Sequence, residues 1–107
     1  MIGQERCKMK WESEKEKHSR GGVFYLTDHR LIFEAEMGGL RSRKLITAFE
    51  EPLEDVRNVS LISSVLGGTR GISIESSVGV RDFVGLSQPE LWQDSTLEKV
   101  HARREHI

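Results

Sequence analysis

The sequence predicts a mainly β fold, namely a bent antiparallel β-sandwich or partly open barrel of about seven strands capped by one C-terminal α-helix. Short runs with period-2 alternation follow one another along the chain as far as Val84, and ten glycines supply turns between them. The pattern changes to helical spacing only after Ser87. Because no helix separates the strands, neighbouring strands must pair antiparallel, and a parallel sheet is excluded.

The clearest element is a hairpin within Gly21–Glu36. Two runs rich in β-branched and aromatic residues, Val23–Thr27 and Leu31–Ala35, flank the polar pair Asp28-His29, which predicts a tight turn. The second run alternates between two faces, with Leu31, Phe33 and Ala35 on one and Ile32, Glu34 and Glu36 on the other. This alternation is typical of a half-buried strand.

Further strands are expected on both sides of this hairpin. The first lies within Arg6–Glu16, with Cys7, Met9 and Trp11 facing the core. The charged stretch Ser13–Arg20 either extends this strand or forms a loop, and Gly21-Gly22 then separates it from the hairpin. The remaining strands are expected, in chain order, at Lys44–Phe49, Val56–Ser63, Gly71–Glu75 and Val80–Val84.

A C-terminal helix is predicted from about Gln88 into Ala102–Arg104. Ser87 supplies a cap, a proline follows in the first turn, and Glu90 lies three residues after the cap, which is the capping-box signature. The residues that share one helical stripe are Trp92, Thr96, Leu97 and Val100. We expect Trp92 to cover an open end of the sheet and to be buried against the same sandwich as Phe33.

Length and composition bound the class of protein. The 107 residues predict one domain at 5–104, with flexible termini at 1–4 and 105–107. Sixteen basic against 17 acidic residues give the whole chain no strong attraction to nucleic acid or to a membrane, so any such attraction requires a local patch. The single cysteine, Cys7, excludes an intramolecular disulfide and fits a reducing compartment. With no signal-peptide core and no run of about 20 apolar residues, we expect a cytoplasmic protein, in solution or peripheral at a membrane.

Three segments resemble a known family. The segment Gly22–Glu34 (GVFYLTDHRLIFE) is similar to the hairpin G-x-L-Y-L-T-x-x-R-L-I-F of GRAM domains and of bacterial and archaeal pleckstrin-homology-like (PH-like) domains. Leu53–Ser60 resembles the strand that follows there, and Phe83 with Pro89–Trp92 resembles the last strand and capping helix. The resemblance extends from about Glu5 to Val100. It implies a seven-stranded bent sandwich closed by a helix, and a non-enzymatic module that binds lipid head groups, membranes or proteins.

Two basic clusters are the candidate anion- or lipid-binding residues. They comprise Lys15, Lys17 and Arg20 before the hairpin, and Arg41, Arg43 and Lys44 after it. The hairpin strands are antiparallel, so its entry and exit lie at one end of the sheet, and the clusters are expected to merge into one patch. The first approaches the lysine and arginine pattern of lipid-binding PH domains, but Glu14 and Glu16 interrupt it, so a solvated charged face is the alternative.

Apolar residues in glycine-flanked loops are the second kind of candidate. Leu40 is a candidate for insertion into a membrane or a partner, as are Val65 and Leu66, with packing back on the core as the alternative. Arg30, at the start of a strand, is expected to have a structural role in an ion pair or in backbone hydrogen bonds.

Catalysis, metal binding and nucleotide binding receive no support from the motifs. Asp28-His29 is best explained as a turn, since no nucleophile motif accompanies it. His101 and His106 are five residues apart, which does not place them on one helical face, and no glycine pair precedes a phosphate-loop lysine. We therefore expect no enzyme activity and no cofactor. The expected function is docking to a membrane surface or a protein partner, and the alternative is a structural or oligomerisation domain without lipid binding.

Overall fold

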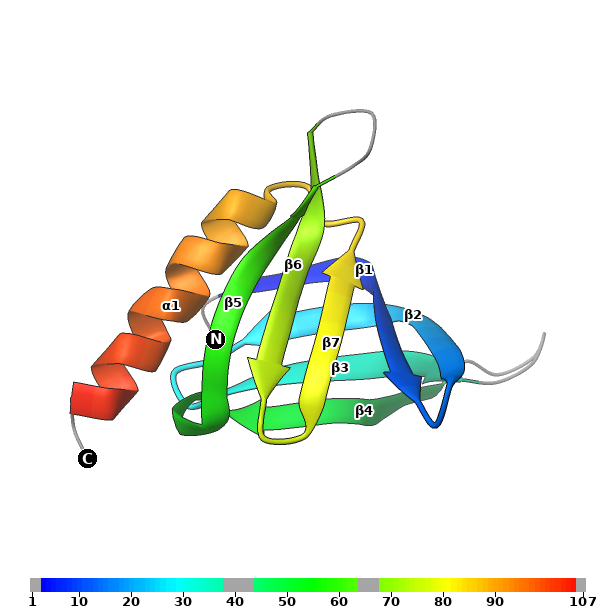
Figure 1. Ribbon diagram of the computed structural model, residues 1–107, viewed down its shortest axis with the longest axis horizontal. Helices are drawn as coiled ribbons and strands as arrows, with labels where there is room; N and C mark the ends of the chain where they lie inside the picture. The colour runs from blue at the N-terminus through cyan, green and yellow to red at the C-terminus, as the bar shows by residue number, and fades with distance from the viewer. Residues whose placement is uncertain (1–2, 38–43, 64–67, 106–107) are drawn as a thin grey trace.

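The computed structural model describes residues 3–37, 44–63 and 68–105 and confirms the mainly β class (Figure 1). Within these residues the strands are β1 (Gly3–Ser13), β2 (Glu16–Leu26), β3 (Arg30–Met37), β4 (Lys44–Pro52), β5 (Val56–Ser63), β6 (Thr69–Ser76) and β7 (Gly79–Val84). A single 3₁₀ turn, Leu53–Asp55, joins β4 to β5, and the chain ends in α1 (Pro89–Glu105). None of the described helices is long and apolar enough to cross a membrane.

All seven strands belong to one unclosed antiparallel sheet, in the order β4-β3-β2-β1-β7-β6-β5. β1 pairs with β2 along its whole length, from Gly3 opposite Leu26 to Ser13 opposite Glu16. It pairs with β7 only through Lys8–Lys10. Figure 1 shows β5, β6 and β7 crossing in front of β2, β3 and β4, with α1 alongside β5. The sheet is therefore strongly bent at β1, and its two edges, β4 and β5, remain unpaired with each other.

Aromatic side chains fill the space inside the bend. Phe24, Phe33 and Phe83 are fully buried, and the ring centroids of Phe24 and Phe83 lie 4.1 Å apart. On its other side Phe24 stacks on Trp92 of α1, with 4.8 Å between the ring centroids. The predicted burial of Phe33 and Trp92 in one core is confirmed.

Glu5 joins the start of the sheet to the start of the helix. Its carboxylate accepts hydrogen bonds from the indole Nε1–H of Trp92 (2.9 Å) and from the backbone N–H of Ser87 (2.6 Å). The amides of Leu91 and Trp92 both donate to the Gln88 carbonyl, at 3.1 and 3.3 Å, and the helix begins at Pro89. The capping position is therefore Gln88, one residue after the Ser87 that the sequence predicts.

The rest of α1 is fixed to β5 and its neighbouring turns. Gln93 Nε2 donates to the Val59 carbonyl (3.0 Å) and Arg104 Nη2 to the Val56 carbonyl (2.6 Å). Lys99 pairs with Asp28 in the β2–β3 turn, and Arg103 pairs with Glu54 in the 3₁₀ turn. Helix side chains thus satisfy carbonyls along one edge of the sheet.

β2 begins earlier than the sequence suggests. The charged stretch extends the strands, because only Glu14 and Lys15 form the turn between β1 and β2, with positive φ values of 49° and 70°. Gly21-Gly22 does not separate two elements and instead lies inside β2. A Cβ at Gly22 would stand 2.1 Å from the Glu34 carbonyl oxygen, so the glycine permits a close approach of β3.

Other boundaries differ by a few residues. β1 begins at Gly3 and α1 ends at Glu105, so both elements include residues expected in the flexible termini. β4 continues beyond Phe49 to Pro52, which is compatible with a strand at the sheet edge because no neighbour there needs the missing N–H.

Candidate functional site

A groove opens where the β1–β2 hairpin separates from β7. Beyond the pair Lys10 and Asp82, β1 continues to Ser13 and β7 extends back to Gly79, but the two strands no longer pair with each other. The groove has a volume of about 680 Å³ and is lined by residues 10–12 of β1, residues 17–19 of β2, and Val80 and Asp82 of β7. Ligand pockets typically occupy about 300–1,000 Å³, so this groove can accept a side chain or a short segment.

A stacked group of three side chains forms one wall. Trp11 and His18 are directly opposite each other on β1 and β2, and their rings stack with centroids 5.0 Å apart. The guanidinium carbon of Arg81 lies 5.7 Å from the centre of the Trp11 ring, within the range of a cation–π contact. Ser13 Oγ is hydrogen-bonded to His18 Nε2 at 2.9 Å. The Trp11 ring is therefore held in place from two sides.

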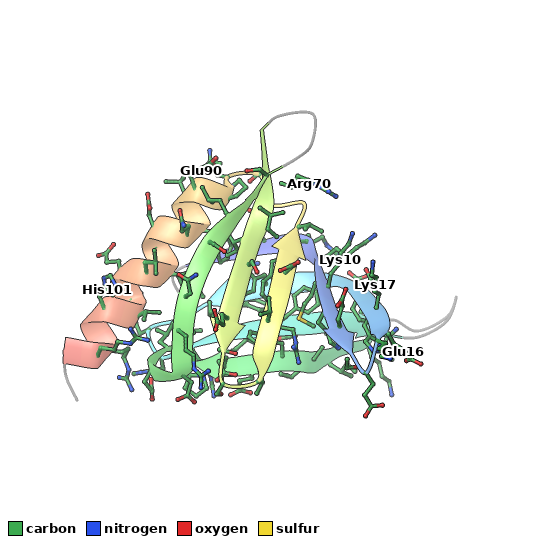
Figure 2. All side chains as sticks on the ribbon, in the orientation of Figure 1. Lys10, Glu16, Lys17, Arg70, Glu90 and His101 are labelled. Atoms are coloured by element: carbon green, nitrogen blue, oxygen red, sulfur yellow. The ribbon has the colours of Figure 1, made fainter. Side chains whose placement is uncertain are left out.

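Residues from both faces of the sheet contribute, because the groove lies in the gap between two strands. Trp11 and His18 follow the alternation of the core residues, whereas Lys10 and Lys17 point to the outer face. The register places Lys10 opposite Ser19 and Lys17 opposite Glu12. Figure 2 shows Lys10 and Lys17 at the end of the molecule away from α1.

Charges of both signs line the groove, namely the cations of Lys10 and Lys17 and the carboxylates of Glu12 and Asp82. The ion pairs among the described residues are Arg6–Glu36, Arg30–Glu50, Lys99–Asp28 and Arg103–Glu54. None of these pairs uses Lys10 or Lys17, although the strand register places Lys10 opposite Asp82 and Lys17 opposite Glu12. Asp82 also accepts a hydrogen bond from Ser73 Oγ at 2.7 Å.

Four of the six basic residues predicted from the sequence are described, and Lys17 and Arg20 do not share one face. Lys17 lines the groove, but Arg20 lies on the opposite face of β2, across from Met9. Lys15 is in the β1–β2 turn, and Lys44 begins β4 across from Met37. Alternation along β2 therefore separates Lys17 from Arg20. The predicted positions Leu40, Arg41, Arg43, Val65 and Leu66 lie outside the described residues.

The groove residues Lys10, Trp11 and Val80 are not among the site residues predicted from the sequence, and neither is Arg81, which contacts the Trp11 ring. One signal existed for the first two, because a turn at Glu14-Lys15 fixes a register that brings residue 10 opposite residue 19. No local pattern signals Val80 or Arg81, because the long-range pairing of β7 with β1 brings Val80 to the groove and Arg81 to the Trp11 ring.

The other singled-out residues have structural roles. Arg30 makes the expected ion pair, with Glu50 at 2.6 Å. The turn at Asp28-His29 is confirmed. Thr27 stabilises it, because its Oγ1 accepts hydrogen bonds from the backbone amides of His29 (3.1 Å) and Arg30 (3.0 Å). Within residues 3–37, 44–63 and 68–105, no group of three or more histidine, cysteine or acidic side chains is placed to hold a metal ion.

Three buried or paired groups are poor candidates for catalysis. Burial, aided by the nearby Glu5 charge, raises the pKa of the Cys7 thiol to about 12, so the nucleophilic thiolate is scarce at neutral pH. Glu51 is 2% exposed and accepts a hydrogen bond from Ser77 Oγ at 2.7 Å, which ties β4 to the β6–β7 turn. Ser13 and His18 have the separation of a nucleophile and a base, but His18 stacks on Trp11 and no described carboxylate binds its other ring nitrogen.

The free edge of β4 is a second surface of interest. All five side chains from Lys44 to Ala48 are exposed, including Leu45 (49%) and Ile46 (46%). β4 pairs only with β3, and its outer side carries the unpaired backbone groups of an edge strand.

Comparisons with known proteins bear on the fold. No protein-family model matches the sequence, and no curated protein matches it either. Among solved structures, the chain is similar to the C-terminal domain of an unknown protein from Leishmania infantum, with a TM-score of 0.65 and 12% sequence identity. The match covers 92% of this chain and 82% of that one. At this identity the likeness supports the shared fold and carries no function.

Proposed function

We propose that this domain is a non-catalytic PH-like binding module that docks a protein partner at the groove between the β1–β2 hairpin and β7. The hairpin resemblance and the bent sheet with its terminal helix support the PH-like assignment. The observation that carries the docking proposal is the groove itself, with Trp11 held in its wall and with Lys10 and Lys17 in none of the ion pairs among the described residues.

The shape and charge of the groove favour a protein segment over a membrane surface. A protein surface binds an anionic bilayer best when apolar side chains protrude from it and its charged groups are all positive. Here the aromatic ring lies in a recess, and Glu12 and Asp82 line that recess beside the lysines. Docking to anionic lipid head groups through Lys15, Lys17, Arg20, Arg41, Arg43 and Lys44, with Leu40 inserted, is therefore the second form of this proposal.

An oligomerisation domain is the competing function, and the exposed edge of β4 favours it. A second copy that added its own β4 would cover Leu45 and Ile46 and pair their backbone groups. Size-exclusion chromatography with light scattering decides this directly. A concentration-independent monomer excludes the competing function, whereas a dimer that Ile46→Lys dissolves would support it.

Selection of random peptides displayed on phage tests the docking proposal. We expect wild-type protein to enrich peptides whose binding is lost in a Lys10→Glu, Lys17→Glu double variant and kept in Arg57→Glu. Arg57 is the matched control because it is an exposed cation of β5 that takes part in no ion pair within the described part of the chain. Co-sedimentation with phosphatidylcholine–phosphatidylserine vesicles at low and physiological salt tests the lipid form in parallel. The binding-module proposal is refuted if no peptide depends on the groove and no vesicle sediments the protein.

A further inference from the structure

We propose that the groove binds an extended, uncharged segment of a partner protein as an added β-strand, through the backbone groups of Val80 on β7 and Glu12 on β1. This inference rests on the proposed docking function and adds to it the mode of binding and the chemistry of the partner. It follows from the hydrogen-bond pattern of the two strands where they separate, and from the balance of charge in the groove.

The backbone N–H and C=O of Val80 point away from β6. Opposite residues of an antiparallel pair alternate between hydrogen-bonded and non-hydrogen-bonded pairs. The Gly85 N–H donates to the Arg70 carbonyl at 3.0 Å, which makes these two residues a bonded pair. Counted in twos along the unbroken register of β6 with β7, Arg81 is also in a bonded pair and Val80 is not. The Val80 carbonyl accepts instead from Arg81 Nη1, at 3.2 Å.

The backbone groups of Glu12 point away from β2 for the same reason. Ser13 and Glu16 flank the two-residue turn between β1 and β2, and such turns are closed by a hydrogen bond between the flanking residues. Alternation then makes the next pair, Glu12 and Lys17, a non-hydrogen-bonded one. If β1 and β7 continued in register, Glu12 would stand opposite Val80, but the two strands no longer pair there. Both residues therefore direct an N–H and a C=O into the groove.

These backbone groups offer an added strand two edges to bind. Successive residues of an extended chain direct their N–H and C=O groups to opposite sides. A segment in the groove can therefore bond to Val80 with one residue and to Glu12 with the next. The Val80 carbonyl can keep its bond from Arg81, because a carbonyl oxygen has two lone pairs. Main-chain hydrogen bonds of this kind supply the affinity when a peptide adds to a sheet edge.

The side chains of the groove favour an uncharged segment. Lys10 stands opposite Asp82 and Lys17 opposite Glu12, so each cation has a carboxylate beside it. A charged ligand side chain would meet its own sign as readily as the opposite one. A residue paired with Val80 shares its face of the sheet, where the valine is 51% exposed. An apolar β-branched side chain at that position would cover the valine and suit an extended backbone.

Hydrogen exchange measured by heteronuclear NMR on the intact chain tests the inference. The probes are acetyl-Gly-Thr-Val-Thr-Val-Thr-Gly-amide and the same peptide with both valine amides N-methylated, which keeps the side chains and removes two backbone donors. In the free protein the amides of Glu12 and Val80 should exchange rapidly. Those of Trp11 and Arg81 face β2 and β6, so they should exchange slowly with or without peptide and serve as internal controls.

The unmethylated peptide should slow exchange of the Glu12 and Val80 amides in a saturable manner and shift the indole signal of Trp11, which lines the groove. The methylated peptide should bind at least about tenfold more weakly, since each lost hydrogen bond weakens binding about two- to tenfold. Glutamate or lysine in place of the central threonine should not strengthen binding. Salt at 0.5 M should not weaken it, because no ligand charge is involved.

Equal binding of the two peptides, or a bound peptide that slows exchange at neither Glu12 nor Val80, would overturn strand addition. A charged peptide that binds several-fold more tightly would overturn the uncharged partner. The inference also fails, while the docking function stands, if phage-selected peptides shift the Trp11 indole signal without slowing exchange at either amide. If neither the designed nor the phage-selected peptides shift the Trp11 signal, docking at the groove fails with it.

Discussion

Replacing Glu5 with alanine should destabilise the domain through one hydrogen bond at the sheet–helix junction. The Trp92 indole N–H is buried, with the residue 9% exposed, and its acceptor is the Glu5 carboxylate at 2.9 Å. Without this acceptor the donor is left unsatisfied, at a cost of about 1.5–3 kcal/mol for a hydrogen bond to a charged group. The second donor, the Ser87 amide, is exposed and can donate a hydrogen bond to water instead. We therefore expect a loss of about 2 kcal/mol, out of roughly 5–10 kcal/mol for such a domain.

Urea denaturation followed by far-UV circular dichroism measures this loss. Glu5→Gln keeps an acceptor oxygen and should lose only about 1 kcal/mol. A double-mutant cycle with Trp92→Phe, which keeps a ring but removes the donor, should give a coupling energy of about 1–2 kcal/mol. Gln4→Ala, an exposed neighbour, is the matched control. The reasoning is refuted if Glu5→Ala unfolds within about 0.5 kcal/mol of wild type or if the coupling is zero.

Three other predictions follow from packing, capping and burial. In the same urea experiment Phe33→Ala and Trp92→Ala should each lower the free energy of unfolding by about 3–5 kcal/mol. Leu91→Ala, at a position 57% exposed, should leave it nearly unchanged, and equal stability of the three variants would contradict the assigned core. Because Gln88 holds the capping position, Ser87→Ala should lower the free energy of unfolding by less than about 0.5 kcal/mol, and Gln88→Asp should raise it by about 0.5–1 kcal/mol. A large loss in Ser87→Ala with no gain in Gln88→Asp would instead assign the cap to Ser87. Cys7 should react with a disulfide reagent at pH 8 much more slowly than after unfolding, because its folded pKa is about 12, against 9.0 for the exposed thiol. Between about pH 9 and 12 the Cys7 thiol is ionised in the unfolded chain but not in the folded protein. Folding stability should therefore fall as the pH rises through this range.

Most of the fold could be predicted because its strands carry local period-2 signals. The β2–β3 hairpin, the faces of β3 and the burial of Phe33 and Trp92 all follow from side-chain alternation and helical spacing. The continuity of β2 through Gly21-Gly22 could not be predicted, since glycine pairs usually mark turns. Here glycine serves the close approach of β3 to β2, which depends on a strand pairing that no local window contains.

The candidate site was much less predictable than the fold. Proximity in sequence predicts one basic cluster, but alternation places Lys17 and Arg20 on opposite faces of β2. Lys10 and Lys17 come together through the register of the β1–β2 turn, and Arg81 reaches Trp11 only because β7 pairs with β1 about 70 residues along the chain. The link between Glu5 and Trp92 has the same long-range origin.

Mapping a phage-selected peptide onto the protein by heteronuclear NMR tests the docking proposal most directly. The account predicts saturable shifts confined to residues 10–19 and 79–82, with the indole signal of Trp11 among them and that of Trp92 unchanged. Shifts concentrated along Leu45–Ala48 of β4 or on α1, with the groove signals unmoved, would contradict it and assign binding to another surface of the domain.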